Sequence, residues 1–267
     1  MMVSAVRFNS GVHGKHEPMT DPELRNSLIE DLDAAFSRPE PATIDRSSVS
    51  AVVGSIRTSV LPAMHARRIR LVDALQTFNT RSSTPYEQAQ QRLDFERVQV
   101  ELLEALAAQL DEVAAYLSVA DADELASICE GILAGATERS AVEGVRMLIR
   151  GKVAAGIITE AAGRLITAVV NAELELERRI GSMVHQIGHD LNEDEVPDPA
   201  ALERVSKISD FHRDLSATVV QVEHVGASVD GEGVDQAILL VDAALRDGAY
   251  EPALAAIRAV IGRASSL

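Results

Sequence analysis

The sequence contains one cysteine, few aromatic side chains and very little lysine. Cys129 is the only cysteine among 267 residues, which excludes a disulfide within the chain and a metal centre built from several thiolates. Aromatic residues make up 3% of the chain and tryptophan is absent, so the core must be built from aliphatic side chains. Such a core suits close-packed helices better than a sheet, in which aromatic and β-branched residues are favoured.

Long apolar runs and the common catalytic signatures are also missing. No stretch approaches the ~20 apolar residues of a membrane helix, and the first residues lack the apolar centre of a signal peptide. These features predict a cytoplasmic protein that does not bind membranes. The sequence contains no phosphate-binding glycine loop, no GxSxG and no HExxH. We therefore expect a non-catalytic protein without a cofactor.

Positive charge is scarce, with 25 Lys and Arg residues against 41 Asp and Glu residues, so the formal net charge is −16. A surface this acidic repels phosphate backbones, which argues against nucleic-acid binding. One segment differs, since residues 45–80 hold five arginines and two aspartates. We interpret this basic segment as a surface for acidic helices of the same protein or of a second copy. The candidate interaction residues are those of this segment and of a matching segment further along: Arg67, Arg68, Arg70, Arg178 and Arg179.

Helical periodicity runs through most of the chain. Residues 47–78 form one apolar stripe that Pro62 should kink or split. The stretch TPYE at Thr84 starts the next helix with a capping box. Its apolar residues repeat at spacings of three and four between 93 and 117, interrupted only by Glu96, which gives a heptad seam. That seam invites a homodimer through helices, although we favour packing within the chain as its use.

Single residues predict the other helix ends. Asp121 and Glu124 should cap a shorter helix that ends in a turn at Gly135, and Gly151 and Gly156 should loosen the chain after the next helix. Asp198 with Pro199 should begin another helix, and a glycine turn should precede the last one.

Two distant stretches resemble each other, GATERSAVEGVRMLI from Gly135 and GAYEPALAAIRAVI from Gly248. The two glycines are 113 residues apart, and Asp123 and Asp235 are 112 apart. The pair Arg67-Arg68 matches Arg178-Arg179 at a spacing of 111. This near-constant spacing predicts an internal duplication in which both halves fold as similar helical bundles. The alternative is a chance alignment in a helical chain rich in Ala, Leu and Arg.

The fold prediction is therefore all-α, with two tandem helical-bundle modules. Residues 1–19 form a flexible arm, and residues 20–44 form an N-terminal helix and a proline-rich linker. Module 1 covers residues 45–150 and module 2 covers residues 157–267. The stretch AALRDGAYEPALAAIRAVI resembles one tetratricopeptide unit. No neighbouring copies recur at that family's spacing, so the resemblance implies a helical hairpin and no function.

One pair of side chains could carry chemistry. His185 and His189 lie four residues apart on a predicted helix, and both point away from its apolar stripe. Two such imidazoles can chelate a transition metal, with Asp190 or Glu193 as oxygen donors. A solvent-facing histidine of a bundle could also carry a phosphoryl group. The first functional hypothesis is nevertheless an adaptor, regulator or scaffold that binds a protein partner or itself, and the second is metal binding or phosphotransfer through His185 and His189.

Overall fold

The computed structural model describes residues 43–77, 84–192 and 198–266, and every regular element in these ranges is a helix. The predicted arm of residues 1–19 and the helix after Thr20 lie outside the described residues. The described part falls into two compact units, one with residues 62–98 and the other with residues 43–61 and 99–266. The all-α prediction is confirmed, whereas the boundaries of the two predicted modules stay a prediction.

The first helical run is divided in the way that Pro62 predicts. It consists of α2 (Val49–Ser55), a π-helical turn (Ile56–Val60) and α3 (Leu61–Thr77). Ser48 caps α2, because its Oγ accepts a hydrogen bond from the backbone N–H of Ala51 at 3.1 Å. Proline lacks an N–H group and its ring crowds the carbonyl four residues earlier. The wider π turn before Pro62 accommodates both effects without ending the helix.

The heptad seam belongs to α4 (Thr84–Asp111), which ends before a 3-10 turn at Ala114–Tyr116. The seam is packed within the chain, since Val100, Leu103, Ala107 and Leu110 are almost completely buried. Two glycines of α6 (Thr137–Ala154) receive one side chain from α4 and one from the turn that follows it. A Cβ at Gly144 would lie 3.0 Å from Cδ1 of Leu106, and one at Gly151 would lie 2.5 Å from Cγ2 of Val113. Leu106 and Val113 are seven residues apart, as are the two glycines, so knobs and holes match in register.

Some helix boundaries differ from those expected. The helix α5 (Val119–Ala134) starts at Ser118, which caps it with Asp121 at the third position, so Asp121 is not the first capping residue. The reason is a reciprocal capping box, in which the short Asp121 side chain reaches back to the N–H of Ser118. Gly151 does not loosen the chain, because it is buried inside α6. The turn after α6 is made by Gly156, whose φ of +70° favours glycine.

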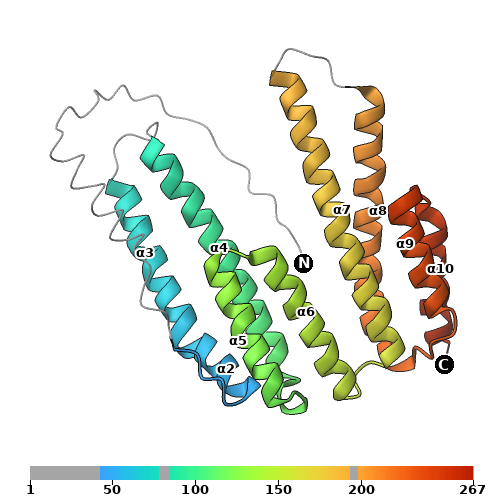
Figure 1. The fold of residues 1–267 in the computed structure, drawn as a ribbon, viewed down its shortest axis with the longest axis horizontal. Helices are drawn as coiled ribbons and strands as arrows, with labels where there is room; N and C mark the ends of the chain where they lie inside the picture. Colours follow the sequence, from blue (N-terminus) through green and yellow to red (C-terminus); the bar gives the residue numbers. More distant parts are fainter. Residues whose placement is uncertain (1–42, 78–83, 193–197, 267) are drawn as a thin grey trace. The chain divides into compact units, whose positions relative to one another are not determined.

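The C-terminal helices form a four-helix bundle within the second unit. Its members are α7 (Glu160–Asn192), α8 (Pro199–Val225), α9 (Val234–Asp247) and α10 (Tyr250–Ala264). Figure 1 shows α7 and α8 as a long antiparallel hairpin, with the shorter α9 and α10 packed against its lower part. Asp198 and Pro199 begin α8 as the sequence predicts, with the Asp198 carboxylate accepting from the N–H of Ala200 at 2.9 Å. The core of this bundle is aliphatic apart from Phe211 and the partly buried Tyr250.

Candidate functional site

An open groove with a volume of about 840 Å³ lies between α6, α7 and α9 in the second unit. Its floor is mostly apolar and includes Ile149, Val153, Ala168, Ile238 and Leu245. The helices α6 and α7 are consecutive in the sequence, whereas α9 comes later, and both α6 and α9 contact α7. We call this hollow the α6–α7–α9 groove.

The groove exists because α7 presents small side chains between its two neighbours. Gly163, Thr167 and Asn171 follow one another at intervals of four along α7, and Ala168 and Ala172 lie beside them. At one end α6 and α7 approach closely, since a Cβ at Gly163 would lie 2.9 Å from Cγ2 of Val153. Larger residues at these positions would fill the groove from below.

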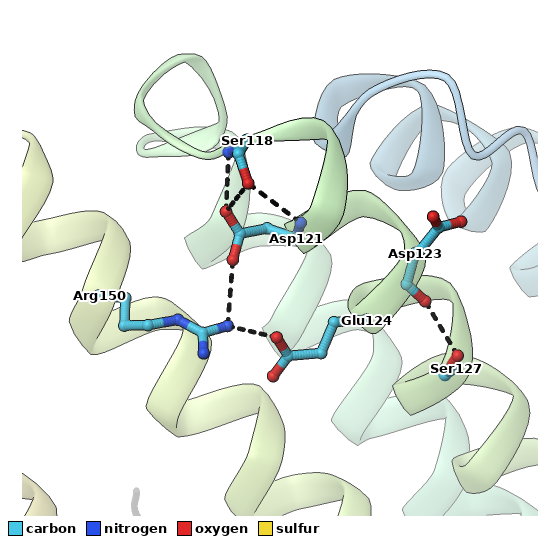
Figure 2. A network of polar contacts seen from close by, with 6 residues as sticks. All are labelled: Ser118, Asp121, Asp123, Glu124, Ser127 and Arg150. Carbon is cyan, nitrogen blue, oxygen red and sulfur yellow. Dashed lines mark hydrogen bonds and ion pairs between the residues drawn. The ribbon is translucent and has the colours of Figure 1, made fainter.

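Arg150 on the α6 side of the groove is held by a network that starts at the first turn of α5. Figure 2 shows its Nη2 between Asp121 Oδ1 at 3.1 Å and Glu124 Oε2 at 2.6 Å. The other carboxylate oxygen of Asp121 accepts from the N–H and Oγ of Ser118, at 2.7 and 2.6 Å. These bonds from Ser118 hold the pKa of Asp121 below its ordinary value, and the positive charge of Arg150 adds to the effect. Arg150 therefore has one fixed orientation along the rim.

Two further arginines line the groove. Arg164 of α7 pairs with Asp235 at 2.7 Å, so its charge is balanced. The exposed Arg146 of α6 donates to the neutral amide oxygen of Asn171 at 2.8 Å. Among the described residues, Arg146 has no acidic partner, although Glu160 and Asp242 also line the groove. Its guanidinium can donate two parallel hydrogen bonds to a carboxylate or phosphate group.

The predicted histidine pair is exposed on α7. His185 and His189 both lie on the surface. Glu193 and the side chain of Asp190, the suggested oxygen donors, lie outside the described parts. Within the described ranges, no group of three or more His, Cys, Asp or Glu is placed to hold a metal ion. The metal hypothesis therefore stays a prediction that rests on the two imidazoles.

The five predicted interaction arginines have different surroundings. Arg67 is buried and pairs with Glu96 Oε1 at 2.7 Å, and Arg68 is half-buried. Arg179 donates to Glu175 at 2.8 Å and to the carbonyl oxygen of Leu245. Only Arg70 and Arg178 are exposed. Three of the five side chains thus serve contacts within the chain or are partly covered, and the proposed role in partner binding rests on the other two.

The groove arginines were not singled out by the sequence. Arg146 and Arg150 are four residues apart, which places them on one face of α6, and the small residues of α7 repeat at the same interval. Those two patterns are the local signals that point to a lined groove. Neither spacing pattern shows that α6 packs against α7 after the turn at Gly156. That contact is known only from the structure.

Two further titratable groups lie elsewhere. Glu173 of α7 is half-buried beside Ser216 and His212 of α8, and this partial burial raises the pKa of its carboxyl group above the ordinary value. Cys129 is fully buried in α5, and burial raises the pKa of its thiol to about 12. The thiol is therefore neutral and poorly reactive.

A scan against protein-family models matches no family, and searches of curated proteins and of solved structures find no match. Within the described ranges, no helix combines the length and apolar character needed to cross a membrane. The function is therefore argued from the groove itself.

Proposed function

We propose that this chain is a non-catalytic helical interaction protein, an adaptor or scaffold, that binds an amphipathic helix of a protein partner in the α6–α7–α9 groove. The observation that carries the proposal is the groove of about 840 Å³ with its apolar floor and arginine rim. An amphipathic helix binds such a groove by placing its apolar face on the floor. The small side chains of α7 leave room for the larger apolar side chains of the partner.

The charges that line the groove indicate which kind of partner helix would fit. Within the described ranges, Arg146 is the groove arginine that contacts a neutral side chain, Asn171, and no carboxylate. Arg150 is fixed beside it by two carboxylates, so it adds rigidity more than free charge. A partner helix that carries an acidic residue next to its apolar face would satisfy Arg146. The surrounding chain, at −16, disfavours partners with many acidic residues, so specificity depends on one or two well-placed carboxylates.

The test places a photo-crosslinking amino acid at Ala168 on the groove floor, in the cells that make the protein. A matched probe replaces Ala217, an exposed alanine of α8 away from the groove. We expect a discrete crosslinked partner from position 168 only, and we expect Arg146→Glu to weaken it. Equal products from both positions, or none from position 168, would contradict the proposal.

A second candidate, metal binding or phosphotransfer through His185 and His189, is favoured by one observation. Both imidazoles are exposed and stand four residues apart on α7, where a metal ion or a phosphodonor can reach them. Native mass spectrometry of the isolated protein distinguishes this candidate. A bound metal or phosphoryl group that disappears in the double alanine variant would place α7 at the centre of function.

A further inference from the structure

The α7–α8 hairpin is longer than the α9–α10 hairpin that packs on it. Arg179 of α7 donates to the carbonyl oxygen of Leu245 in the last turn of α9. Phe211 of α8 stacks on Tyr250, the first residue of α10, with ring centroids 4.4 Å apart. The turn between α9 and α10 is therefore level with Arg179 and Phe211. Beyond it, residues 180–192 and 199–210 continue as a two-helix extension, which Figure 1 shows rising past α9 and α10.

One side of this extension faces away from α9 and α10. Gly181 is two residues from Arg179, which turns it by about 200° around the helix axis. Leu202 is nine residues from Phe211, two and a half turns, which also places it on the opposite side. The side chains that share this side are Gly181, Val184 and Gly188 of α7 and Leu202, Ser206 and Ser209 of α8. We call this set the outer face.

The outer face is apolar or neutral and is not covered by the described residues. Val184 is 52% exposed and Leu202 is 49% exposed. A Cβ built at Gly181 or Gly188 would meet no heavy atom within 4 Å. None of the six residues is charged, in a chain of which 25% of the residues are charged and the net charge is −16. Two copies of this acidic chain can therefore meet here without placing like charges in contact.

The spacing on α7 repeats a packing that the chain already uses. On α6, two glycines seven residues apart receive Leu106 and Val113, also seven apart. On α7, Gly181 and Gly188 are seven apart as well, and Val184 stands between them. A small–large–small pattern is self-complementary under two-fold symmetry, because the valine of each copy can fit beside a glycine of the other. We propose that the outer face is a homodimer interface between two antiparallel α7–α8 hairpins.

The area of the outer face limits the affinity that this dimer can have. Thirteen residues of helix span about 20 Å, and two packed helices are about 20 Å wide. The two copies together would remove on the order of 1,000 Å² of accessible surface, which is the lower limit for a specific interface. We therefore expect a reversible dimer with a dissociation constant on the order of micromolar.

Sedimentation velocity of the full chain tests the interface with two matched pairs of variants. Gly188→Leu blocks the approach of a second copy but has open space in the monomer, as does the control Gly262→Leu on α10. Val184→Glu puts a charge on the outer face, and the control Val220→Glu makes the same change at a 64% exposed valine of α8 below the extension. We expect both outer-face variants to raise the dissociation constant about ten-fold or more, with both controls close to wild type.

A crosslinking experiment locates the contact. Because Cys129 is buried, Val184→Cys introduces the one accessible thiol, and a short bismaleimide should join two copies through it. Val220→Cys should give no crosslinked dimer. A wild-type chain that stays monomeric at 100-fold the expected constant, a dimer unaffected at Gly188 and Val184, or equal crosslinking at 184 and 220 would each overturn the proposal.

Discussion

The buried ion pair between Arg67 of α3 and Glu96 of α4 allows a direct test of how a charge in the heptad seam affects stability. Glu96 is 1% exposed and Arg67 is 8% exposed, and Arg67 Nη2 lies 2.7 Å from Glu96 Oε1. Glu96 Oε2 and Arg67 Nε are buried without a hydrogen-bond partner in the described part of the chain. Arg92 approaches Glu96 at 3.4 Å but is 41% exposed, so it compensates little. The pair is therefore geometrically incomplete and strongly desolvated.

Removing one partner should cost far more than removing both. Glu96→Leu leaves the Arg67 guanidinium buried without its counter-ion, and we expect a loss of about 3–5 kcal/mol in the free energy of unfolding. Arg67→Met should cost a similar amount, because it strands the carboxylate. The double variant replaces both charges by apolar groups of similar volume and should lie within about 1 kcal/mol of wild type or above it.

Urea unfolding followed by circular dichroism at 222 nm measures this cycle. The reasoning predicts a coupling energy of at least about 3 kcal/mol between the two sites. A double variant that loses the sum of the two single losses would show that the residues do not act as a pair. Wild-type stability in Glu96→Leu would show that the carboxylate is not buried in solution.

Three further predictions follow from other residues. Gly151→Ala should lower the free energy of unfolding by about 1–3 kcal/mol, because the new Cβ would lie 2.5 Å from Cγ2 of Val113. The matched change Gly54→Ala in α2, where a Cβ meets open space, should raise the free energy of unfolding by about 0.5–1 kcal/mol in the same urea assay. Burial raises the pKa of Glu173 above 4.5, so the folded state holds this proton more tightly than the unfolded state, and its contribution to stability is lost as pH rises through the folded-state pKa. Glu173→Gln should therefore gain stability over wild type with increasing pH, and a constant difference from pH 4 to 8 would refute this. Replacing His185 and His189 together by Ala should change the free energy of unfolding by less than about 0.5 kcal/mol, since both are exposed, and a larger loss in thermal unfolding would show a structural role.

The helix ends show how much of the fold the sequence predicts. Gly135 and Gly248 were expected at turns, and both adopt left-handed backbone conformations with φ of +97° and +72°. Asp198 with Pro199 was expected to begin a helix, and it does. These signals are reliable because they depend on backbone chemistry within a few residues. The start of α5 was misplaced because an aspartate at the third position resembles a cap when Ser118 is overlooked.

Contacts between distant segments account for what the sequence did not predict. Arg67 and Arg179 read as exposed basic residues, yet one neutralises Glu96 and the other binds the end of α9. The interruption of the seam by Glu96 was visible, but its partner lies 29 residues earlier on another helix. The groove likewise needs α6, α7 and α9 to meet. Periodicity shows which face of a helix is apolar and gives no information on which helix covers it.

The predicted duplication stays a prediction, and the turns of the structure can be compared with the spacing on which it rests. The 3-10 turns at 114–116 and 226–228 are 112 residues apart, and the left-handed glycines 135 and 248 are 113 apart. In both halves, an arginine of the last helix reaches the start of the helix before it: Arg150 binds Asp121, and Arg263 donates to the carbonyl oxygen of Glu232. Arg150 and Arg263 are again 113 apart. These equivalences concern turns and side-chain contacts as well as helical composition, and chance alignment stays the alternative.

A duplication would also explain why the groove occurs at α6–α7. In the predicted arrangement, α6 is the last helix of the first copy and α7 is the first helix of the second copy. A surface made by the end of one repeat and the start of the next forms only at a junction, and two copies have a single junction. The residues that shape it, Gly163 and Arg146, would then differ in role from their counterparts in the other half, which do not lie at this junction. If the duplication holds, the proposed helix-binding groove would therefore be a property of the junction between the two copies and not of either copy by itself.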